Sequence, residues 1–343
     1  ENNYTIWHFL RRCYEKGWLY EGTDSMPWCP RCGTGLSNME IATEGYREIT
    51  HDSVYLKFPL LDRENESLLV WTTTPWTLAA NVAAAVHPDK DYSVVERVDE
   101  LVSKTTRVIL ATKLLDRALG GTVVRLEHEQ SSVMRVGPVP GIAVEVERLK
   151  GSELVGLTYS GPFDELPAQD GVAHRVIEWD EVAEDEGTGI VHIAPGGGHD
   201  DFLLGKKYDL PVLAPLDEAG VYIDGYGFLV GQVAGEVAQP VFDSLAEKEV
   251  LERVEPITHR YPVCWRCDSE LVFRVVDEWF ISMDELRHTM MDHTRRIQWV
   301  PEFGLERELD WLRNMDDWMI SKKRYYGLAL PIWKCECGHV DVI

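Results

Sequence analysis

The chain has 343 residues, with 34 basic and 58 acidic side chains and a formal net charge of −24. Its length allows two or three domains with a substantial core. This acidic balance excludes a surface that attracts a nucleic-acid backbone as a whole, so an RNA partner would have to be bound locally. There is no run of about 18 apolar residues and no secretory leader, so we expect no membrane partner and a cytoplasmic location.

The first residues show the spacing of an amphipathic helix, with apolar side chains at Ile6, Phe9, Leu10 and Cys13. We therefore predict a helix here, with Cys13 buried on its apolar face. Because the chain starts at Glu1, directly inside this pattern, we expect it to be a piece of a longer protein.

Short apolar or alternating runs recur further along the chain, separated by glycine, proline and aspartate. They predict strands at 54–58, 67–71, 82–86, 92–98, 108–112, 174–179 and 189–194. The pattern predicts a β-rich, barrel-like domain of roughly 190 residues, over 46–240.

The pattern changes to helical spacing after Pro240. Val241, Leu245, Val250 and Leu251 would share one helix face, and 279–297 and 309–327 are also predicted to be helical. We expect four parts, which are an N-terminal helix with half of a cysteine motif, the β-rich domain, a helix with the other half, and a C-terminal segment. Their ranges are 1–45, 46–240, 241–275 and 276–343.

Six of the seven cysteines form close pairs, namely Cys29 and Cys32, Cys264 and Cys267, and Cys335 and Cys337. Two CxxC pairs supply four thiolates, which is the complete ligand set of a structural zinc site. The alternatives are unrelated surface thiols or a redox dithiol. Cys335 and Cys337 supply only half of a possible metal site. If the CxxC pairs share one metal, everything between them is an insertion that starts and ends at this zinc knuckle.

Two polar stretches are candidates for chemistry. The first, WTTTPWTLAAN at 71–81, follows a predicted strand, and the second, GTGIVHIAPGGGHDDF at 187–202, carries His192, His199, Asp200 and Asp201. Neither matches a P-loop or a dinucleotide fingerprint. Metal binding by the second stretch is one alternative, and ordinary turn and helix-cap residues are another. A polar pocket that binds an ammonium group and positions a water is the third.

Four features together resemble isoleucyl-tRNA synthetase, a class I aminoacyl-tRNA synthetase. They are the two polar stretches, the CPRCG and CWRC pairs, and DWMISKKRYYGLALPIW at 317–333. Thr74 stands where the valine and leucine relatives typically carry an arginine, which favours isoleucine. The resemblance implies a mixed α/β fold, in which a β-barrel-like editing domain is inserted in a zinc-knuckle module with helical flanks from a Rossmann-type catalytic domain.

The resemblance also implies roles for individual residues. Thr72, Thr73, Thr74, Thr77 and Asn81 would orient the ester and the attacking water, and His192 would form the wall that limits side-chain size. Asp201 would bind the substrate ammonium group, and Trp76 would shape the mouth of the pocket. The turn departs from a common bacterial version, because Gly197 stands where a histidine is frequent and His199 where a proline is.

The implied reaction is hydrolysis of Val-tRNA(Ile), with the tRNA(Ile) 3′ end, the misattached valine and the rest of the synthetase chain as partners. The HIGH and KMSKS signatures are absent from the sequence, so ATP and Mg²⁺ would serve only the full-length enzyme, whereas zinc would be structural here. An editing domain of a valyl- or leucyl-type synthetase is one alternative. A zinc-knuckle RNA-binding module without turnover is another.

Overall fold

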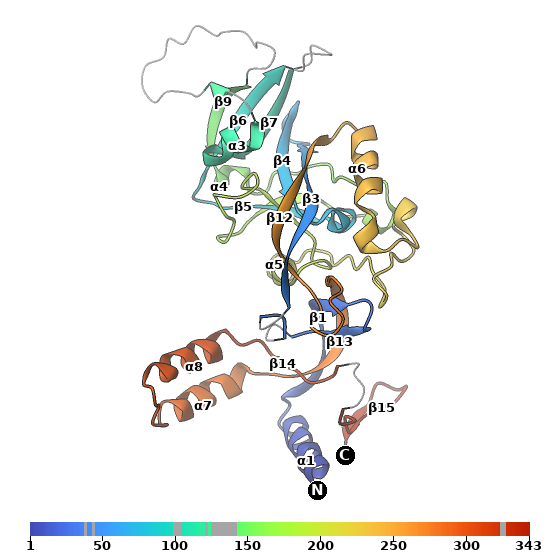
Figure 1. The fold of residues 1–343 in the computed structure, drawn as a ribbon, viewed down its shortest axis with the longest axis vertical. Helices are drawn as coiled ribbons and strands as arrows, with labels where there is room; N and C mark the ends of the chain where they lie inside the picture. The colour runs from blue at the N-terminus through green and yellow to red at the C-terminus, as the bar shows by residue number, and fades with distance from the viewer. Residues whose placement is uncertain (38–39, 43–44, 99–104, 121–122, 125–142, 323–326) are drawn as a thin grey trace. The chain divides into compact units, whose positions relative to one another are not determined.

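A computed structural model of the chain describes residues 1–37, 40–42, 45–98, 105–120, 123–124, 143–322 and 327–343 (Figure 1). The helices are α1 (Asn2–Glu15), α3 (Leu115–Leu119), α4 (Gly151–Leu154), α5 (His199–Tyr208), α6 (Ala238–Glu247), α7 (Asp284–Thr294) and α8 (Phe303–Asn314). Across these ranges, no helix has the length and apolar content needed to span a bilayer.

The strands make the fold mixed α/β. In chain order they are β1 (Leu19–Cys29), β2 (Thr34–Gly35), β3 (Tyr46–Pro59), β4 (Glu66–Thr72), β5 (Ala83–Val86), β6 (Asp91–Val98), β7 (Thr105–Ala111), β8 (Val123–Val124), β9 (Ala143–Lys150), β10 (Arg175–Glu178), β11 (Val191–Ile193), β12 (Leu251–Pro262), β13 (Val272–Ile281), β14 (Trp318–Met319), β15 (Ile332–Lys334) and β16 (Val340–Val342). All seven strands expected between 54 and 194 are therefore present, and β3 begins eight residues earlier than expected, at Tyr46.

The chain divides into two compact units. The larger comprises residues 25–274, and the smaller comprises residues 1–24 with 275–343. The four-part division expected from the sequence is finer than this, and it stays a prediction.

The main sheet of the larger unit has seven strands in the order β12-β3-β4-β7-β6-β9-β8. Its core includes Tyr55, Leu69, Val95, Val108 and Leu110. The order leaves β12 and β8 at opposite edges, and among the described strands these edges do not pair with each other. The sheet is therefore open, and the closed barrel expected from the sequence is not observed.

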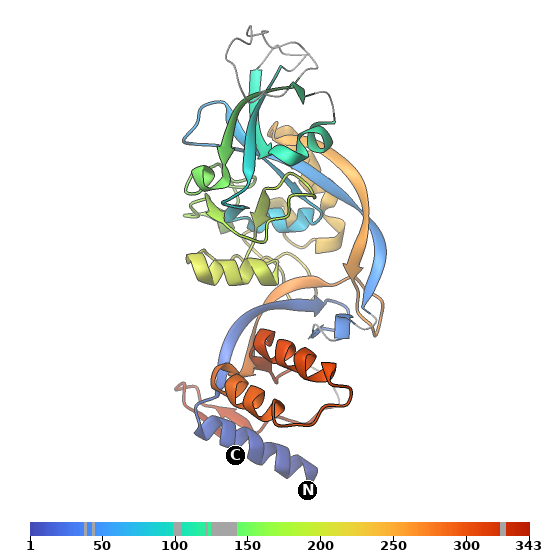
Figure 2. The ribbon, with the colours of Figure 1, turned by 90° about the vertical axis from the view of Figure 1, so that its left-hand side faces the viewer.

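A long antiparallel ribbon of β3 and β12 extends from this sheet, and Figure 2 shows the two strands side by side. Its pairing runs from Tyr46 opposite Pro262 to Leu56 opposite Leu251. The prediction that Val250 and Leu251 lie on a helix face was wrong. Helix α6 ends at Glu247, and Glu249 has a positive φ of 57°, which ends helical geometry before the strand begins.

A second sheet in the larger unit has the order β10-β5-β11. β5 consists of small residues that are all buried, and β10 and β11 pair with it on either side. Val82, Ile177, Ile193 and Leu204 form a buried cluster that packs α5 against this sheet. This sheet holds the candidate site.

The smaller unit packs α1 with β13 and β16 through Leu10, Cys13, Ile281 and Val342, so the prediction that Cys13 is buried is confirmed.

The helix predicted at 279–297 begins only at Asp284, because residues up to 281 belong to β13 and pair with β14. The helix predicted at 309–327 ends at 314 as part of α8, and residues 323–326 of that range lie outside the described chain. That this unit belongs to a Rossmann-type catalytic domain stays a prediction.

Candidate functional site

The threonine stretch folds into a buried turn at the end of β4. Its residues form a short 3₁₀ helix, η1 (Pro75–Ala80), and all six are buried. Pro75 occupies the first position, where a missing N–H breaks no helical hydrogen bond. The Thr74 N–H donates to Thr72 Oγ1 at 3.1 Å, and the Thr77 N–H donates to the Thr74 carbonyl at 3.0 Å. Side-chain hydroxyls thus help form the turn itself.

His192 reaches this turn from β11. It lies opposite Ala84 of β5 in the antiparallel register, and its side chain is buried. The ring Nε2 lies 2.8 Å from Thr77 Oγ1, and Nδ1 lies 3.4 Å from Asn81 Nδ2. Burial lowers the pKa of His192 to about 4, so the imidazole is neutral at physiological pH.

Asn81 forms hydrogen bonds to β5 and to Tyr159, which is far from it in the sequence. The Tyr159 hydroxyl donates to Asn81 Oδ1 at 2.8 Å, and Asn81 Nδ2 donates to the Ala83 carbonyl at 2.9 Å. A carbonyl can only accept a hydrogen bond, so this second contact fixes which end of the amide carries the NH₂ group. Thr77, His192, Asn81 and Tyr159 therefore form one continuous buried network.

Asp201 lies in the first turn of α5, which begins at His199. The sequence left open that Asp201 caps a helix starting near Phe202, but the N-cap position is occupied by Gly198. The Asp201 carboxylate instead accepts the Ala194 N–H at 2.9 Å. Burial of the carboxyl raises the pKa of Asp201 to about 7, and the charge of Asp200 adds to this effect.

The glycine turn at 196–198 separates Thr77 from Asp201. A Cβ atom at Gly197 would lie 2.8 Å from Thr77 Cγ2, and one at Gly198 would lie 3.2 Å from Asp201 Cγ. A histidine at 197 would therefore require Thr77 to shift. His199 Nδ1 lies 3.3 Å from the Ser25 carbonyl. In the described part of the chain no metal-ligand group includes any of the histidines or aspartates of this stretch, so the metal alternative lacks support.

The remaining predicted pocket residues differ in their environments. The Thr72 and Thr74 hydroxyls are 3.2 Å apart, whereas the half-buried Thr73 hydroxyl forms no hydrogen bond to any residue that the structure describes. Trp76 is buried, and its carbonyl accepts the Tyr222 hydroxyl. Thr73 is thus the threonine whose hydroxyl is available to a ligand or a water.

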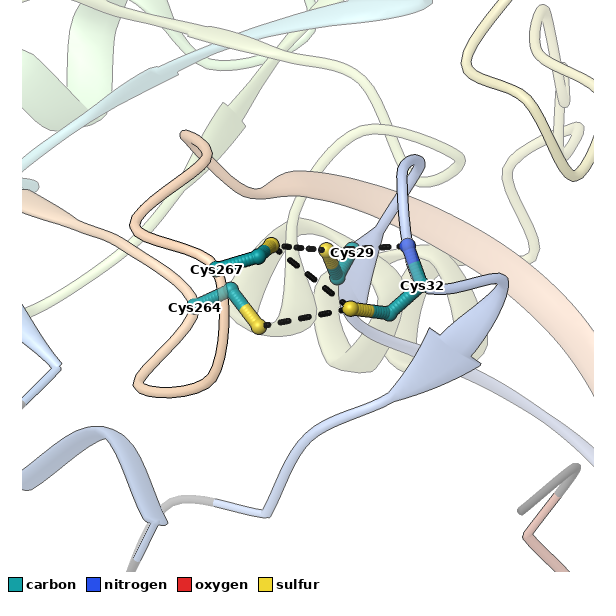
Figure 3. A group of neighbouring side chains, drawn as sticks. All are labelled: Cys29, Cys32, Cys264 and Cys267. Atoms are coloured by element: carbon teal, nitrogen blue, oxygen red, sulfur yellow. Dashed lines mark hydrogen bonds between the residues drawn. The ribbon is translucent and has the colours of Figure 1, made fainter. Parts of the chain in front are cut away.

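The four cysteines of the two CxxC pairs meet at one point, as Figure 3 shows. Cys267 Sγ lies 3.5 Å from Cys29 Sγ and 3.6 Å from Cys32 Sγ, and Cys32 Sγ lies 4.0 Å from Cys264 Sγ. A tetrahedral zinc with Zn–S bonds of about 2.3 Å requires sulfur atoms about 3.8 Å apart. The four thiols thus fit a zinc ion, and Leu36, Ile41 and Leu271 pack around them.

Cys335 and Cys337 do not belong to this cluster and lie in the turn between β15 and β16. Both are exposed, and the Cys337 N–H donates to Cys335 Sγ at 3.4 Å. Among the described residues, no third metal-binding side chain lies beside them. They remain half of a possible site.

Two residues of the network carry no sequence signal. Tyr159 is in none of the motifs, and neither is Gln169, whose Nε2 donates to the Ala79 carbonyl at 2.8 Å and to the Asn81 carbonyl at 3.1 Å. Both residues form hydrogen bonds to the end of the η1 turn, although they are far from it in the sequence. Their spacing from the threonine stretch follows no helical or strand period, so only the tertiary structure identifies them.

Comparisons with known proteins give a consistent result. A family model for class I tRNA synthetases (I, L, M and V) matches residues 1–342. The isoleucine--tRNA ligase of Methanothermobacter marburgensis is 39% identical over 342 residues, which cover 99% of this chain and 30% of that protein. The isoleucine--tRNA ligase of Pyrococcus furiosus is 40% identical over 347 residues, which again cover 99% of this chain and 30% of that protein. The chain thus spans about 30% of the length of these relatives.

Among solved structures, the editing domain of the P. knowlesi cytosolic leucyl-tRNA synthetase is 16% identical, covering 48% of this chain and 66% of that chain. Its TM-score of 0.33 is too low to establish a shared fold.

Proposed function

Because the chain belongs to the class I tRNA synthetases of the isoleucine, leucine, methionine and valine group, we propose that its larger unit removes a wrongly attached amino acid from tRNA. The specific reaction is hydrolysis of Val-tRNA(Ile). Water attacks the carbonyl carbon of the ester, the bond to the terminal ribose oxygen breaks, and free valine and tRNA(Ile) are released. No covalent enzyme intermediate forms.

The observation that carries this proposal is the buried turn where η1, β11 and the start of α5 meet. His192 contributes a neutral ring in contact with Thr77, and Thr77 lies against Gly197 of the glycine turn that precedes the half-buried carboxyl of Asp201. Thr73, in the same threonine stretch, has a hydroxyl with no partner among the described residues. A buried carboxylate is costly without a cation, so Asp201 suits the α-ammonium group of an aminoacyl ester. Thr73 can orient the ester or the attacking water, with Thr72, Thr74 and Thr77 supporting it.

The need for such a site follows from the chemistry of amino-acid selection. A pocket distinguishes isoleucine from valine by one methylene, worth about 1 to 3 kcal/mol, a magnitude for which isoleucyl-tRNA synthetase is itself the usual example. A second site must therefore admit valine and exclude isoleucine. His192 would be the wall that sets this size limit, and Trp76 would shape the mouth of the pocket.

Isoleucine is favoured over valine or leucine as the amino acid of the parent enzyme. The similar relatives are isoleucine--tRNA ligases, and Thr74 stands in place of the arginine typical of the valine and leucine enzymes. The partners would be the 3′ end of tRNA(Ile) and the rest of a cytoplasmic synthetase, to which ATP and Mg²⁺ binding belongs. Cys29, Cys32, Cys264 and Cys267 would hold a structural zinc that takes no part in the reaction.

A panel of mischarged tRNAs tests the proposal against its alternatives. The 343-residue chain should release valine from Val-tRNA(Ile) and leave Thr-tRNA(Val) and Met-tRNA(Leu) intact. Preferential clearance of either of the latter two would assign the site to a valyl- or leucyl-type enzyme. Binding of tRNA without release of any amino acid would identify an RNA-binding module instead.

A further inference from the structure

We propose that Tyr159 is a positioning residue, which acts through Asn81 to keep the single proton of the neutral His192 ring on Nε2. The inference extends the proposed hydrolytic site and rests on it for its kinetic readout only. Two ends of the buried network point independently to the same ring tautomer.

The first end is Thr77. Its hydroxyl has one hydrogen, and its Oγ1 lies 2.8 Å from the Thr74 carbonyl and 2.8 Å from His192 Nε2. The carbonyl can only accept, so the Thr77 hydrogen is donated to Thr74. Thr77 Oγ1 must then accept its second hydrogen bond, which requires a proton on His192 Nε2.

The second end is Asn81. Its Oδ1 accepts the Tyr159 hydroxyl, so its NH₂ group faces the Ala83 carbonyl at 2.9 Å, His192 Nδ1 at 3.4 Å and the Ile193 carbonyl at 3.5 Å. A donor facing Nδ1 requires that nitrogen to carry a lone pair and no hydrogen. A doubly protonated ring would place an N–H against the Asn81 NH₂ group, so the network also disfavours the imidazolium form.

Tyr159 is suited to act as the fixed point of this network. It is fully buried, and its ring stacks on Phe58 with centroids 4.9 Å apart and an interplanar angle of 9°. On another side it packs against His174, whose Nε2 lies 2.8 Å from Asp164 Oδ1. Burial raises the pKa of Tyr159 well above its usual value, so the hydroxyl remains a donor.

This arrangement determines what His192 can do. Nε2 is occupied by its own hydrogen, and the Nδ1 lone pair faces Asn81, so neither nitrogen can take a proton from water in the pocket. His192 therefore acts as a rigid wall and as the donor that holds the Thr77 hydroxyl in place.

The test is ¹⁵N NMR of the His192 ring in the complete 343-residue chain. The parent should show the Nε2–H pattern. Tyr159→Phe keeps the ring stack and removes the donor to Asn81 Oδ1, which is one of the two contacts that orient the amide, so a share of the Nδ1–H tautomer should appear beside the Nε2–H form. Tyr92→Phe is the matched control, because Tyr92 is equally buried and its hydroxyl donates to the Gly189 carbonyl, away from Asn81. It should leave the His192 signals unchanged.

The kinetic readout is hydrolysis of Val-tRNA(Ile). Tyr159→Phe should lower kcat roughly tenfold, the size expected for one lost buried hydrogen bond, with KM within about twofold of the parent. Tyr92→Phe should match the parent. If Tyr159→Phe does not fold, Asn81→Asp replaces it, because a carboxylate facing Nδ1 should give the opposite, Nδ1–H pattern.

Three results would overturn the proposal. They are a parent protein in which His192 carries its proton on Nδ1, a Tyr159→Phe variant whose His192 spectrum is unchanged, and an Asn81→Asp variant whose His192 ring keeps its proton on Nε2. The NMR result does not depend on turnover. A parent with the Nε2–H pattern that responds to Tyr159→Phe but releases no valine would support the positioning role and reject the hydrolytic function.

Discussion

Burial moves the pKa values of His192 and Asp201 in opposite directions. His192 falls to about 4 and Asp201 rises to about 7, since in each case removal from water favours the neutral form. His192 therefore does not change its charge between pH 6 and 8. Any pH dependence of the proposed site near neutrality should come from Asp201.

We predict that kcat/KM for hydrolysis of Val-tRNA(Ile) rises with pH and levels off above about 7. The reason is that the free enzyme binds the substrate ammonium group through the ionised Asp201 carboxylate, which is depleted at lower pH. Rates measured from pH 5.5 to 8.5 test this. Asp201→Asn should be slow at every pH and lose this rise. An Asp201→Asn variant as fast as the parent would show that the carboxylate does not bind the ammonium group.

Asp201 should also lower the free energy of unfolding at neutral pH. The folded state keeps a proton on Asp201 between the unfolded pKa of 3.8 and about 7, so the free energy of unfolding falls as pH rises through that window. Asp201→Asn can still accept the Ala194 N–H without the buried charge. We predict that it unfolds like the parent near pH 4 and is more stable at pH 8, by on the order of 1 to 4 kcal/mol.

Thermal or urea unfolding at the two pH values measures this difference. Asp200→Asn is the matched control, because Asp200 lies one residue earlier in the same helix turn and is exposed. Its stability should stay close to that of the parent at pH 4 and rise less than that of Asp201→Asn at pH 8, because it removes only the smaller contribution of the Asp200 charge to the raised pKa of Asp201. Equal stability of Asp201→Asn and the parent at pH 8 would mean that the carboxyl is well solvated.

Individual site residues could be predicted from the sequence to different extents. Thr77, Asn81 and His192 lie in recognisable stretches, and the structure brings them into contact. Tyr159 and Gln169 could not be predicted, because each is placed by tertiary packing and has no local pattern of its own. Hydrogen-bond direction is also a tertiary property, since it depends on which carbonyl groups surround a side chain.

At the level of elements, the cysteine cluster joins two segments far apart in the sequence. Cys29 ends β1, and Cys264 follows β12, the strand that pairs with β3 along the ribbon. Nearby, the Trp28 Nε1–H donates to the Glu218 carbonyl at 2.8 Å. A metal bound here would tie these two segments together.

We predict about one zinc per chain in the purified protein, bound by the four clustered thiolates. A Cys264→Ser, Cys267→Ser double variant should retain less than about a fifth of this zinc and should melt at a lower temperature, because the two loops are no longer joined. Elemental analysis and a thermal melt measure both effects.

The matched control is a Cys335→Ser, Cys337→Ser double variant, which removes the other close pair and should keep the full zinc content. If the Cys264 and Cys267 variant keeps its zinc, or if the control loses it, the metal is bound elsewhere.

Strands with a clear apolar pattern were predictable, but the ribbon was not. β5 is a continuous apolar run and β4 contains one at 68–71, and both become core strands. β12 alternates between half-buried and exposed residues along its length, and its apolar positions near the N-terminal end also fit a helix period. β13 was missed for a related reason, since its last residues directly precede the helical pattern of α7.

At the scale of the whole molecule, the two units are considered separately. The larger unit contains the candidate site and the cysteine cluster. The open order of its main sheet could not be predicted, because strand periodicity does not specify which edges pair.

We predict that the 343-residue chain does not form isoleucyl-adenylate, because HIGH and KMSKS are absent from its sequence. Isoleucine-dependent exchange of pyrophosphate with ATP should stay at the level of a mock preparation. Exchange clearly above that level would show that these residues contain a complete activation site.

The most direct test of the account compares two esters of the same tRNA under single-turnover conditions. The chain should release valine from Val-tRNA(Ile) at least about tenfold faster than isoleucine from Ile-tRNA(Ile), because the proposed wall at His192 excludes one additional methylene. Asp201→Ala should abolish the faster reaction while its thermal melt confirms folding. Equal rates for the two esters, or no release of valine by the folded parent chain, would contradict the proposed editing function.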